Sequence, residues 1–174
     1  MRTLSAILAF GVLMLSMSSV GQSRRSELQL KLGAQDYGTL SMNGSLQLTM
    51  TLENVGDRPV TLYNKLLRGH AGGVILRVTD DTGKEVVPDS LDDDIVAPPE
   101  PSTPANERFV TLYPDHLWGR TERVPLSDLV KKPGVYHLTC MYKSPLPKTL
   151  GHGPNFWSSE RPTLQSNRLD FTVR

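Results

Sequence analysis

The chain has little of what most catalytic or cross-linked proteins are built from. Among its 174 residues there is one cysteine, Cys140, so no disulfide can form within the chain. Aromatic residues make up only 6%, and there are four histidines. The sequence contains no G-x-S-x-G, no H-E-x-x-H, no C-x-x-C and no P-loop. These absences exclude a disulfide scaffold and the common hydrolase, redox and nucleotide motifs, so we predict that the protein is not an enzyme and uses no cofactor.

Metal ligands are sparse as well. A zinc or copper site needs three histidines, or two with a carboxylate, to converge. His70, His116, His137 and His152 are scattered along the chain, and only His116 and His152 are expected in loops that can approach each other. The acidic run at 92–94 lacks the glycine and the distal glutamate of a calcium-binding loop. We therefore predict no metal site.

The chain has no excess of either positive or negative charge. The chain carries 19 Lys and Arg against 18 Asp and Glu. Residues 1–21 hold one of these charges, Arg2, so the remainder is formally neutral. Neither nucleic acid nor an anionic membrane would be held by such a chain through its net charge. The acidic residues at 89–94 are interpreted as part of a solvated loop.

A long apolar run occurs at the N-terminus. Residues 4–20 are apolar or small and follow Arg2, and Ser19 and Gly21 are small residues before a plausible cleavage site at Gln22. This is the pattern of a secretory signal peptide. We predict that residues 1–21 are removed and that the mature protein is periplasmic or secreted, with no membrane insertion after cleavage. The alternative is an uncleaved anchor, because the run approaches the length that spans a bilayer.

The residue pattern of the rest of the chain predicts short strands. In 45–54, Leu46, Leu48, Met50 and Leu52 alternate with polar residues, which predicts a strand with one face on a core and the other in water. The other expected strands are 26–34, 59–67, 73–80, 84–87, 108–114, 120–124, 136–142 and 166–174, with one helical turn at 127–130.

Two long loops interrupt these strands. Residues 88–106 contain five prolines, and 144–165 contain His152, Phe156 and Trp157. A second group of aromatic side chains, with His116 and Trp118, is expected in a turn at 113–120. Aromatic residues on sandwich loops either cover the end of the core or form a contact surface.

Four segments carry a family resemblance: "LTMTLENVGDRPVTL", "GVILRVTDDTGKEV", "VPLSDLVKKPGVYHLTCMY" and "SNRLDFTVR". With them, residues 26–174 resemble bacterial secreted immunoglobulin-like domains. The resemblance implies an all-β, antiparallel two-sheet sandwich of about eight strands, and it supplies no catalytic residues. Similar frames occur in adhesion-type modules, proteinase-inhibitor domains and propeptides of secreted metalloproteases.

The resemblance also bears on Cys140. In disulfide-linked immunoglobulin domains a cysteine on this strand is bonded across the sandwich, where this chain is expected to place Leu48 or Met50. We therefore predict that Cys140 is a buried packing residue with an inert thiol. Tyr136 resembles the tyrosine that supports the corner between the sheets, although it lies four residues before the cysteine and not two.

Three functions follow as hypotheses. The favoured one is an exported, non-catalytic interaction or structural module, whose partner is another extracytoplasmic protein or a glycan. An inhibitor or propeptide-like domain would insert loop 88–106 or 144–165 into a protease. A glycan- or metal-binding accessory domain would use the tryptophans and histidines. The candidate partner-binding residues are Trp118, His116, His152, Phe156 and Trp157.

Overall fold

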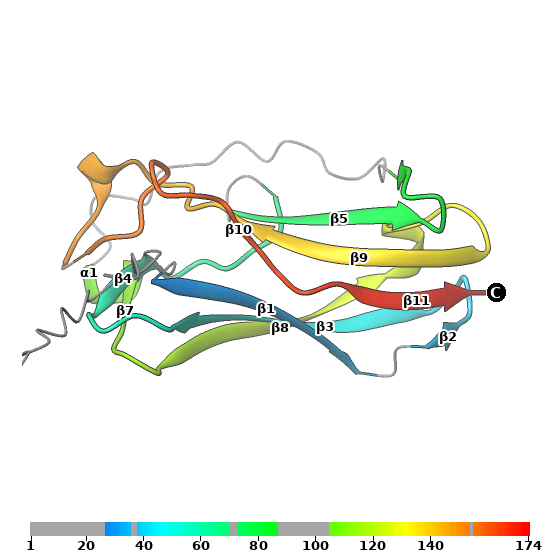
Figure 1. Ribbon diagram of the computed structural model, residues 1–174, viewed down its shortest axis with the longest axis horizontal. Coiled ribbons are helices and arrows are strands. Elements are labelled where there is room, and N and C mark those ends of the chain that lie inside the picture. Colours follow the sequence, from blue (N-terminus) through cyan, green and yellow to red (C-terminus); the bar gives the residue numbers. More distant parts are fainter. Residues whose placement is uncertain (1–26, 36–37, 70–72, 87–104, 154) are drawn as a thin grey trace, which may run out of the picture.

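Two sheets packed face to face form the body of the protein (Figure 1). The computed structural model describes residues 27–35, 38–69, 73–86, 105–153 and 155–174. One sheet has three strands, in the order β1 (Leu28–Gln35), β3 (Ser45–Asn54) and β8 (Leu117–Pro125). The main path of the other sheet runs β2 (Thr39–Leu40), β11 (Leu169–Val173), β9 (Gly134–Tyr142), β5 (Val74–Asp80) and β6 (Glu85–Val86).

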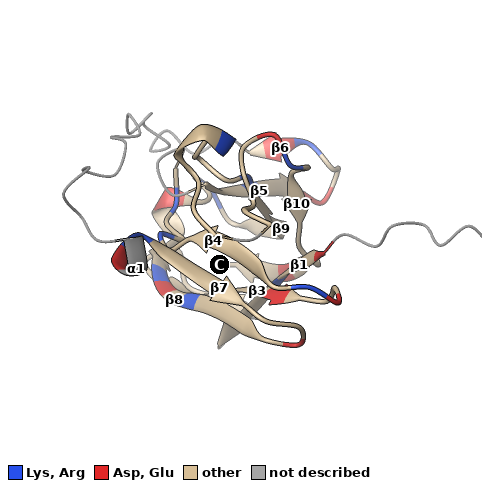
Figure 2. Cartoon of the chain, turned by 90° about the vertical axis from the view of Figure 1, so that its left-hand side faces the viewer, with Lys and Arg blue, Asp and Glu red and all other residues tan. Residues whose placement is uncertain are grey.

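Shorter elements complete one end of the sandwich. β10 (Leu164–Gln165) pairs with β9. β4 (Val60–Tyr63) and β7 (Phe109–Leu112) form a separate antiparallel pair, which Figure 2 shows in front of the two sheets. The helical pieces are α1 (Ala105–Arg108) and two 3₁₀ turns, η1 (Leu126–Asp128) and η2 (Lys148–Leu150).

The core lies between the two sheets, where the alternation in the sequence places it. In β3 the four residues Leu46, Leu48, Met50 and Leu52 are buried, whereas the residues between them are less buried. Burying an aliphatic side chain of this size contributes about 1.5–3 kcal/mol relative to leaving it exposed. The same period of two runs along β9, so the inner faces of both sheets supply the core.

The strand order defines an immunoglobulin-like sandwich. β2 runs parallel to β11, while the other strand pairs are antiparallel. β9 lies between β11 and β5, as the sixth strand of an immunoglobulin domain lies between its seventh and third. The predicted fold class is thus confirmed.

Cys140 lies at the centre of this core as a free, fully buried residue, in the same cluster as Leu48 and Met50. Burial raises the pKa of its thiol to about 12, so the reactive thiolate is suppressed. The predicted packing role of Cys140 is confirmed. Tyr136 is also buried, and its hydroxyl donates a hydrogen bond to the Lys132 carbonyl oxygen at 2.8 Å, which fastens the turn before β9.

Several boundaries differ from the prediction. β8 begins at Leu117, so Trp118 lies on a strand and not in a turn. β4 ends at Tyr63, well before the predicted end at residue 67. A helical turn, α1, precedes β7 where the end of loop 88–106 and the start of strand 108–114 were expected, and β10 lies inside the predicted loop 144–165. The predicted helical turn at 127–130 is η1, which begins one residue earlier and ends two residues earlier than predicted. The predicted signal peptide 1–21 and nearly all of loop 88–106 lie outside the described residues.

Candidate binding groove

The five candidate residues from the sequence fall into four places. His116 is exposed, with its ring 5.7 Å from that of Tyr113. Trp118 is partly buried on β8 against the core. His152 and Phe156 both lie beside Phe109, with ring centroids 6.0 and 5.6 Å from it.

Trp157, the fifth candidate, is 2% exposed and belongs to the main core cluster. The structure therefore brings His152 and Phe156 together and leaves His116 with a different aromatic partner. Within the described residues, no three His, Cys, Asp or Glu side chains are grouped so that they could hold a metal ion.

Backbone and side-chain hydrogen bonds attach the segment around Trp157 to the rest of the fold. The amide of Trp157 donates to the Thr61 carbonyl oxygen at 2.9 Å, and the Asn155 side chain donates to the Pro59 carbonyl oxygen at 3.0 Å. Both acceptors lie at or beside β4. Because the ring is buried and the backbone is attached, this segment covers the end of the core as a lid.

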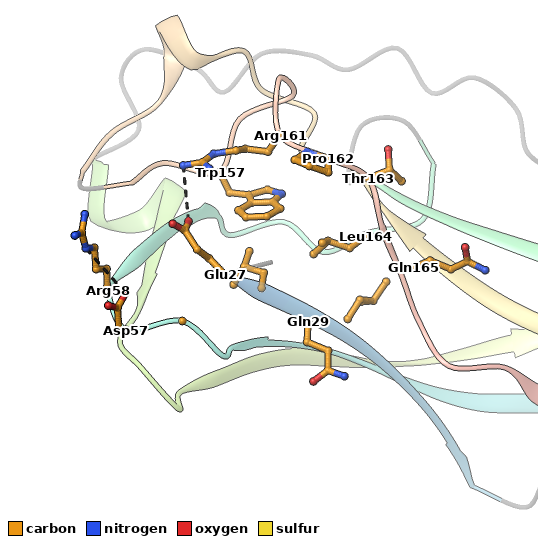
Figure 3. A pocket seen from close by; sticks show the side chains of 13 residues that line it. Glu27, Gln29, Asp57, Arg58, Trp157, Arg161, Pro162, Thr163, Leu164 and Gln165 are labelled. Atoms are coloured by element: carbon orange, nitrogen blue, oxygen red, sulfur yellow. Dashed lines mark ion pairs between the residues drawn. The ribbon is translucent and has the colours of Figure 1, made fainter. Parts of the chain in front are cut away.

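A groove of about 940 Å³ runs beside the lid (Figure 3). Its walls come from four parts of the chain: the start of β1, the turn at 56–58, Trp157, and the segment 161–165 that includes β10. Side chains of both charge signs line it, so the groove has no strong preference for an anion or a cation.

Arg161 and Glu27 lie on either side of the Trp157 ring in Figure 3. The Arg161 guanidinium carbon is 5.5 Å from the ring centroid, a cation–π contact, and Arg161 Nη2 is 3.8 Å from Glu27 Oε2. The ion pair is too long for a hydrogen bond. Two buried polar atoms at this place have no hydrogen-bond partner: the donor Trp157 Nε1, and the acceptor Glu27 Oε2, which has only the long ion pair with Arg161. Leaving such a group unpaired costs about 1–3 kcal/mol, so both favour a ligand that pairs with them.

Two strand edges flank the groove. In β1, the backbone N–H and C=O of Leu32 point away from β3 and are both bonded to the Asn167 side chain, at 2.9 Å each. In an antiparallel strand pair, the backbone groups of successive residues point alternately toward and away from the partner strand. The backbone N–H and C=O of Leu30, two residues before Leu32, therefore also point away from β3. On the opposite wall, the amide of Ser166 bonds to Cys140 in β9, so the backbone groups of Gln165 point away from β9. The groove thus presents backbone donors and acceptors next to the two buried side-chain atoms that lack a hydrogen-bond partner.

Sequence reasoning did not single out Glu27, Arg161 or the two strand edges. Its only signal for the groove was Trp157, one of the aromatic residues of the predicted loop 144–165. Glu27 and Arg161 are separated by most of the chain, and their meeting depends on how β1 packs beside β10.

Comparisons with known proteins identify no family. No family model matches the chain, and no curated protein matches it. No helix among the described residues has the length and apolar character needed to cross a membrane.

Solved structures that are similar include a Listeria innocua β-glucosidase mutant in complex with laminaribiose. It is 14% identical with a TM-score of 0.39, over 86% of this chain and 16% of that one. Another is the C-terminal region of Escherichia coli alpha-2-macroglobulin, 13% identical with a TM-score of 0.39, over 84% and 16%. A β-glucosidase from Erythrobacter marinus is 12% identical with a TM-score of 0.38, over 84% and 16%. The chain spans only 16% of these proteins, and similarities this low assign neither a family nor an activity.

Proposed function

We propose that the protein is an exported, non-catalytic interaction module, and that its groove binds an extended segment of another extracytoplasmic protein. The observation that carries this proposal is the pair of unpartnered buried atoms, Trp157 Nε1 and Glu27 Oε2, in a groove flanked by strand edges. One atom is a donor and the other an acceptor, so the ligand must offer both kinds of group.

A peptide backbone meets this requirement better than other ligand classes. Every peptide unit apart from proline brings one N–H and one C=O, and extended peptides add to sheet edges through these groups. The outward backbone groups of Leu30 are available for that pairing. A glycan is less well supported, because sugars stack on open aromatic faces, and the Trp157 ring is 2% exposed with Arg161 over it.

Arg161 controls access to the groove in this proposal. The two unpartnered atoms are covered in the free chain, and the Arg161 side chain, which is 41% exposed, is the neighbour that can move most easily. A peptide carboxylate or carbonyl that binds Arg161 would draw the guanidinium off the Trp157 ring. The ligand would then reach Trp157 Nε1 with a carbonyl group and Glu27 with an N–H group.

Export and the absence of catalysis belong to the same proposal. The apolar run at 4–20 after Arg2 supports secretion, and the resemblance to secreted immunoglobulin-like modules supports a binding role. The inhibitor and propeptide alternatives need a projecting loop. Segment 144–165 is instead held against the core through Trp157, which favours the groove over an inserted loop.

Site-specific photo-crosslinking in the native host tests the proposal. A benzophenone amino acid replaces Gln29, an exposed residue of the groove, in the exported protein. We expect a discrete crosslinked protein that disappears when Thr163→Trp fills the groove. The matched control is Thr82→Trp, in the exposed hairpin between β5 and β6. An identical crosslink in both tryptophan variants would contradict binding in the groove, as would a crosslink of equal strength from a benzophenone at Thr82.

A further inference from the structure

The two edges of the three-stranded sheet differ. At one edge, β1 is bonded to the Asn167 side chain and lies beside β10. At the other edge, β8 pairs only with β3 among the described strands. β8 is nine residues long and mostly exposed, with Leu117 at 66% exposure. An open edge of this length is a template for pairing with another strand.

The direction of the free backbone groups on β8 follows from its bonds to β3. Leu126 donates to the Gly44 carbonyl oxygen, and the His116 carbonyl oxygen accepts from Asn54. The even-numbered residues of β8 therefore bond to β3. Its odd-numbered residues present their N–H and C=O groups outward, and no described residue bonds to them; these are Leu117, Gly119, Thr121, Arg123 and, with a carbonyl alone, Pro125.

We propose that β8 pairs antiparallel with β8 of a second copy of this chain, with the two-fold axis at Thr121. Thr121 is the midpoint of β8, so this register overlaps all nine residues of both strands. It also places the outward backbone groups of the two copies opposite each other. The three-stranded sheets of the two copies would then join into one continuous sheet.

The side chains of β8 are self-complementary in this register. Arg120 lies opposite the partner's Glu122, and by symmetry Glu122 lies opposite the partner's Arg120. Arg120 is exposed and makes no ion pair with a described residue. Glu122 is 19% exposed; its Oε1 pairs with Arg68 at 2.7 Å, and its Oε2, which is buried in the free chain, has no hydrogen-bond partner. Figure 2 shows the basic and acidic positions adjacent on β8. Opposite charges facing each other across strands are stabilising.

The remaining pairs fit the same register. Trp118 lies opposite the partner's Val124 on the inner side, an aromatic residue against a β-branched one, and such pairs stabilise sheets. On the outer side, Arg123 lies opposite the partner's Gly119, where there is room for its side chain. A two-fold axis at residue 120 or 122 would instead set Arg120 against Arg120 or Glu122 against Glu122, and like charges directly opposite are destabilising.

Charges on the inner face of an edge strand can also keep a protein monomeric. In the β8 pairing proposed here these charges favour a dimer instead, because Arg120 and Glu122 each lie opposite a residue of the other sign in the second copy. A single strand pair gives a small contact area, and contacts below about 1,200 Å² are typically weak and transient. We therefore expect a monomer–dimer equilibrium that depends on protein concentration.

Sedimentation velocity of the purified exported protein over a range of concentrations tests the proposal. The wild type should shift from monomer to dimer. Arg120→Glu sets Glu against Glu at both cross-strand pairs, so the dimer should weaken by about tenfold or more. Arg123→Glu is the matched control, because it makes the same charge change on the same strand but faces Gly119, and it should leave the equilibrium within about twofold.

Thr121→Pro gives a second, independent variant. Its amide points outward, so proline is compatible with the monomer fold at this edge, although the 2.9 Å contact between the Thr121 and Thr49 hydroxyl groups is lost. We expect circular dichroism to show that this variant is folded, and sedimentation velocity to show that it is monomeric. A wild type that stays monomeric at every concentration overturns the proposal. So does a dimer that survives both Arg120→Glu and Thr121→Pro, or one that Arg123→Glu disrupts as strongly as Arg120→Glu does.

Discussion

Trp157 is the residue on which the lid interpretation depends, and replacing it by alanine tests that interpretation. Its ring is 2% exposed within the core cluster, and truncating a large buried aromatic residue typically costs about 3–5 kcal/mol. The variant also loses the cation–π contact with Arg161, worth about 0.5–1 kcal/mol at an exposed cation. Removing the indole N–H that has no hydrogen-bond partner offsets about 1–3 kcal/mol of these losses. We therefore expect Trp157→Ala to lower the free energy of unfolding by about 3 kcal/mol.

Urea unfolding followed by far-ultraviolet circular dichroism measures this change. The slope of the free energy of unfolding against urea concentration should be the same for the variant and the wild type, because unfolding exposes nearly the same surface in both. Trp157→Phe removes the unpaired N–H but keeps an aromatic ring, so it should cost less than about 1.5 kcal/mol. Trp118→Ala is the matched control, because Trp118 is only partly buried, and it should cost about 1 kcal/mol. If Trp157→Ala changes stability by less than about 0.5 kcal/mol, the ring does not cover the core and the reasoning is refuted.

Three further predictions concern the core, the corner and export. Burial raises the pKa of Cys140 from 9.0 to about 12, so the unfolded chain loses this proton first. Between pH 9 and pH 12 this thiol should therefore lower the free energy of unfolding by about 1.4 kcal/mol for each pH unit. Urea unfolding of Cys140→Ala over the same pH range should not show this contribution. Tyr136→Phe removes the bond to the Lys132 carbonyl oxygen and should lower the free energy of unfolding by about 0.5–1.5 kcal/mol. Intact-mass spectrometry of the exported protein should show an N-terminus at Gln22; a full-length species in the cytoplasm would contradict cleavage.

The central strands could be predicted from the sequence because their burial is one-sided. In β3 and β9 every second residue is apolar and buried, so the period of two appears directly in the residues. β8 lacks this signal over most of its length. Its inner positions include Arg120 and Glu122, because an edge strand is only partly covered by the opposite sheet. That is why Trp118 was assigned to a turn.

The groove could not be predicted in the same way. Glu27 and Arg161 meet only because the start of β1 packs beside β10, a strand of two residues with no alternation to mark it. The two unpartnered atoms depend on side-chain geometry, which no residue pattern encodes. What the sequence did indicate was Trp157, as a large apolar residue in a long loop that had to cover something.

The indole N–H signals of the two tryptophans in a ¹⁵N–¹H NMR spectrum give the most direct test of peptide binding in the groove. The probe is an extended peptide selected for binding from a random displayed library. On titration, the Trp157 indole signal should move as Nε1 gains an acceptor, together with the amides of Leu30 and Gln165, while the Trp118 indole signal stays in place. Thr163→Trp should abolish these shifts. A peptide that binds and leaves the Trp157 indole signal unmoved, or that shifts residues away from the groove, would contradict the proposed function.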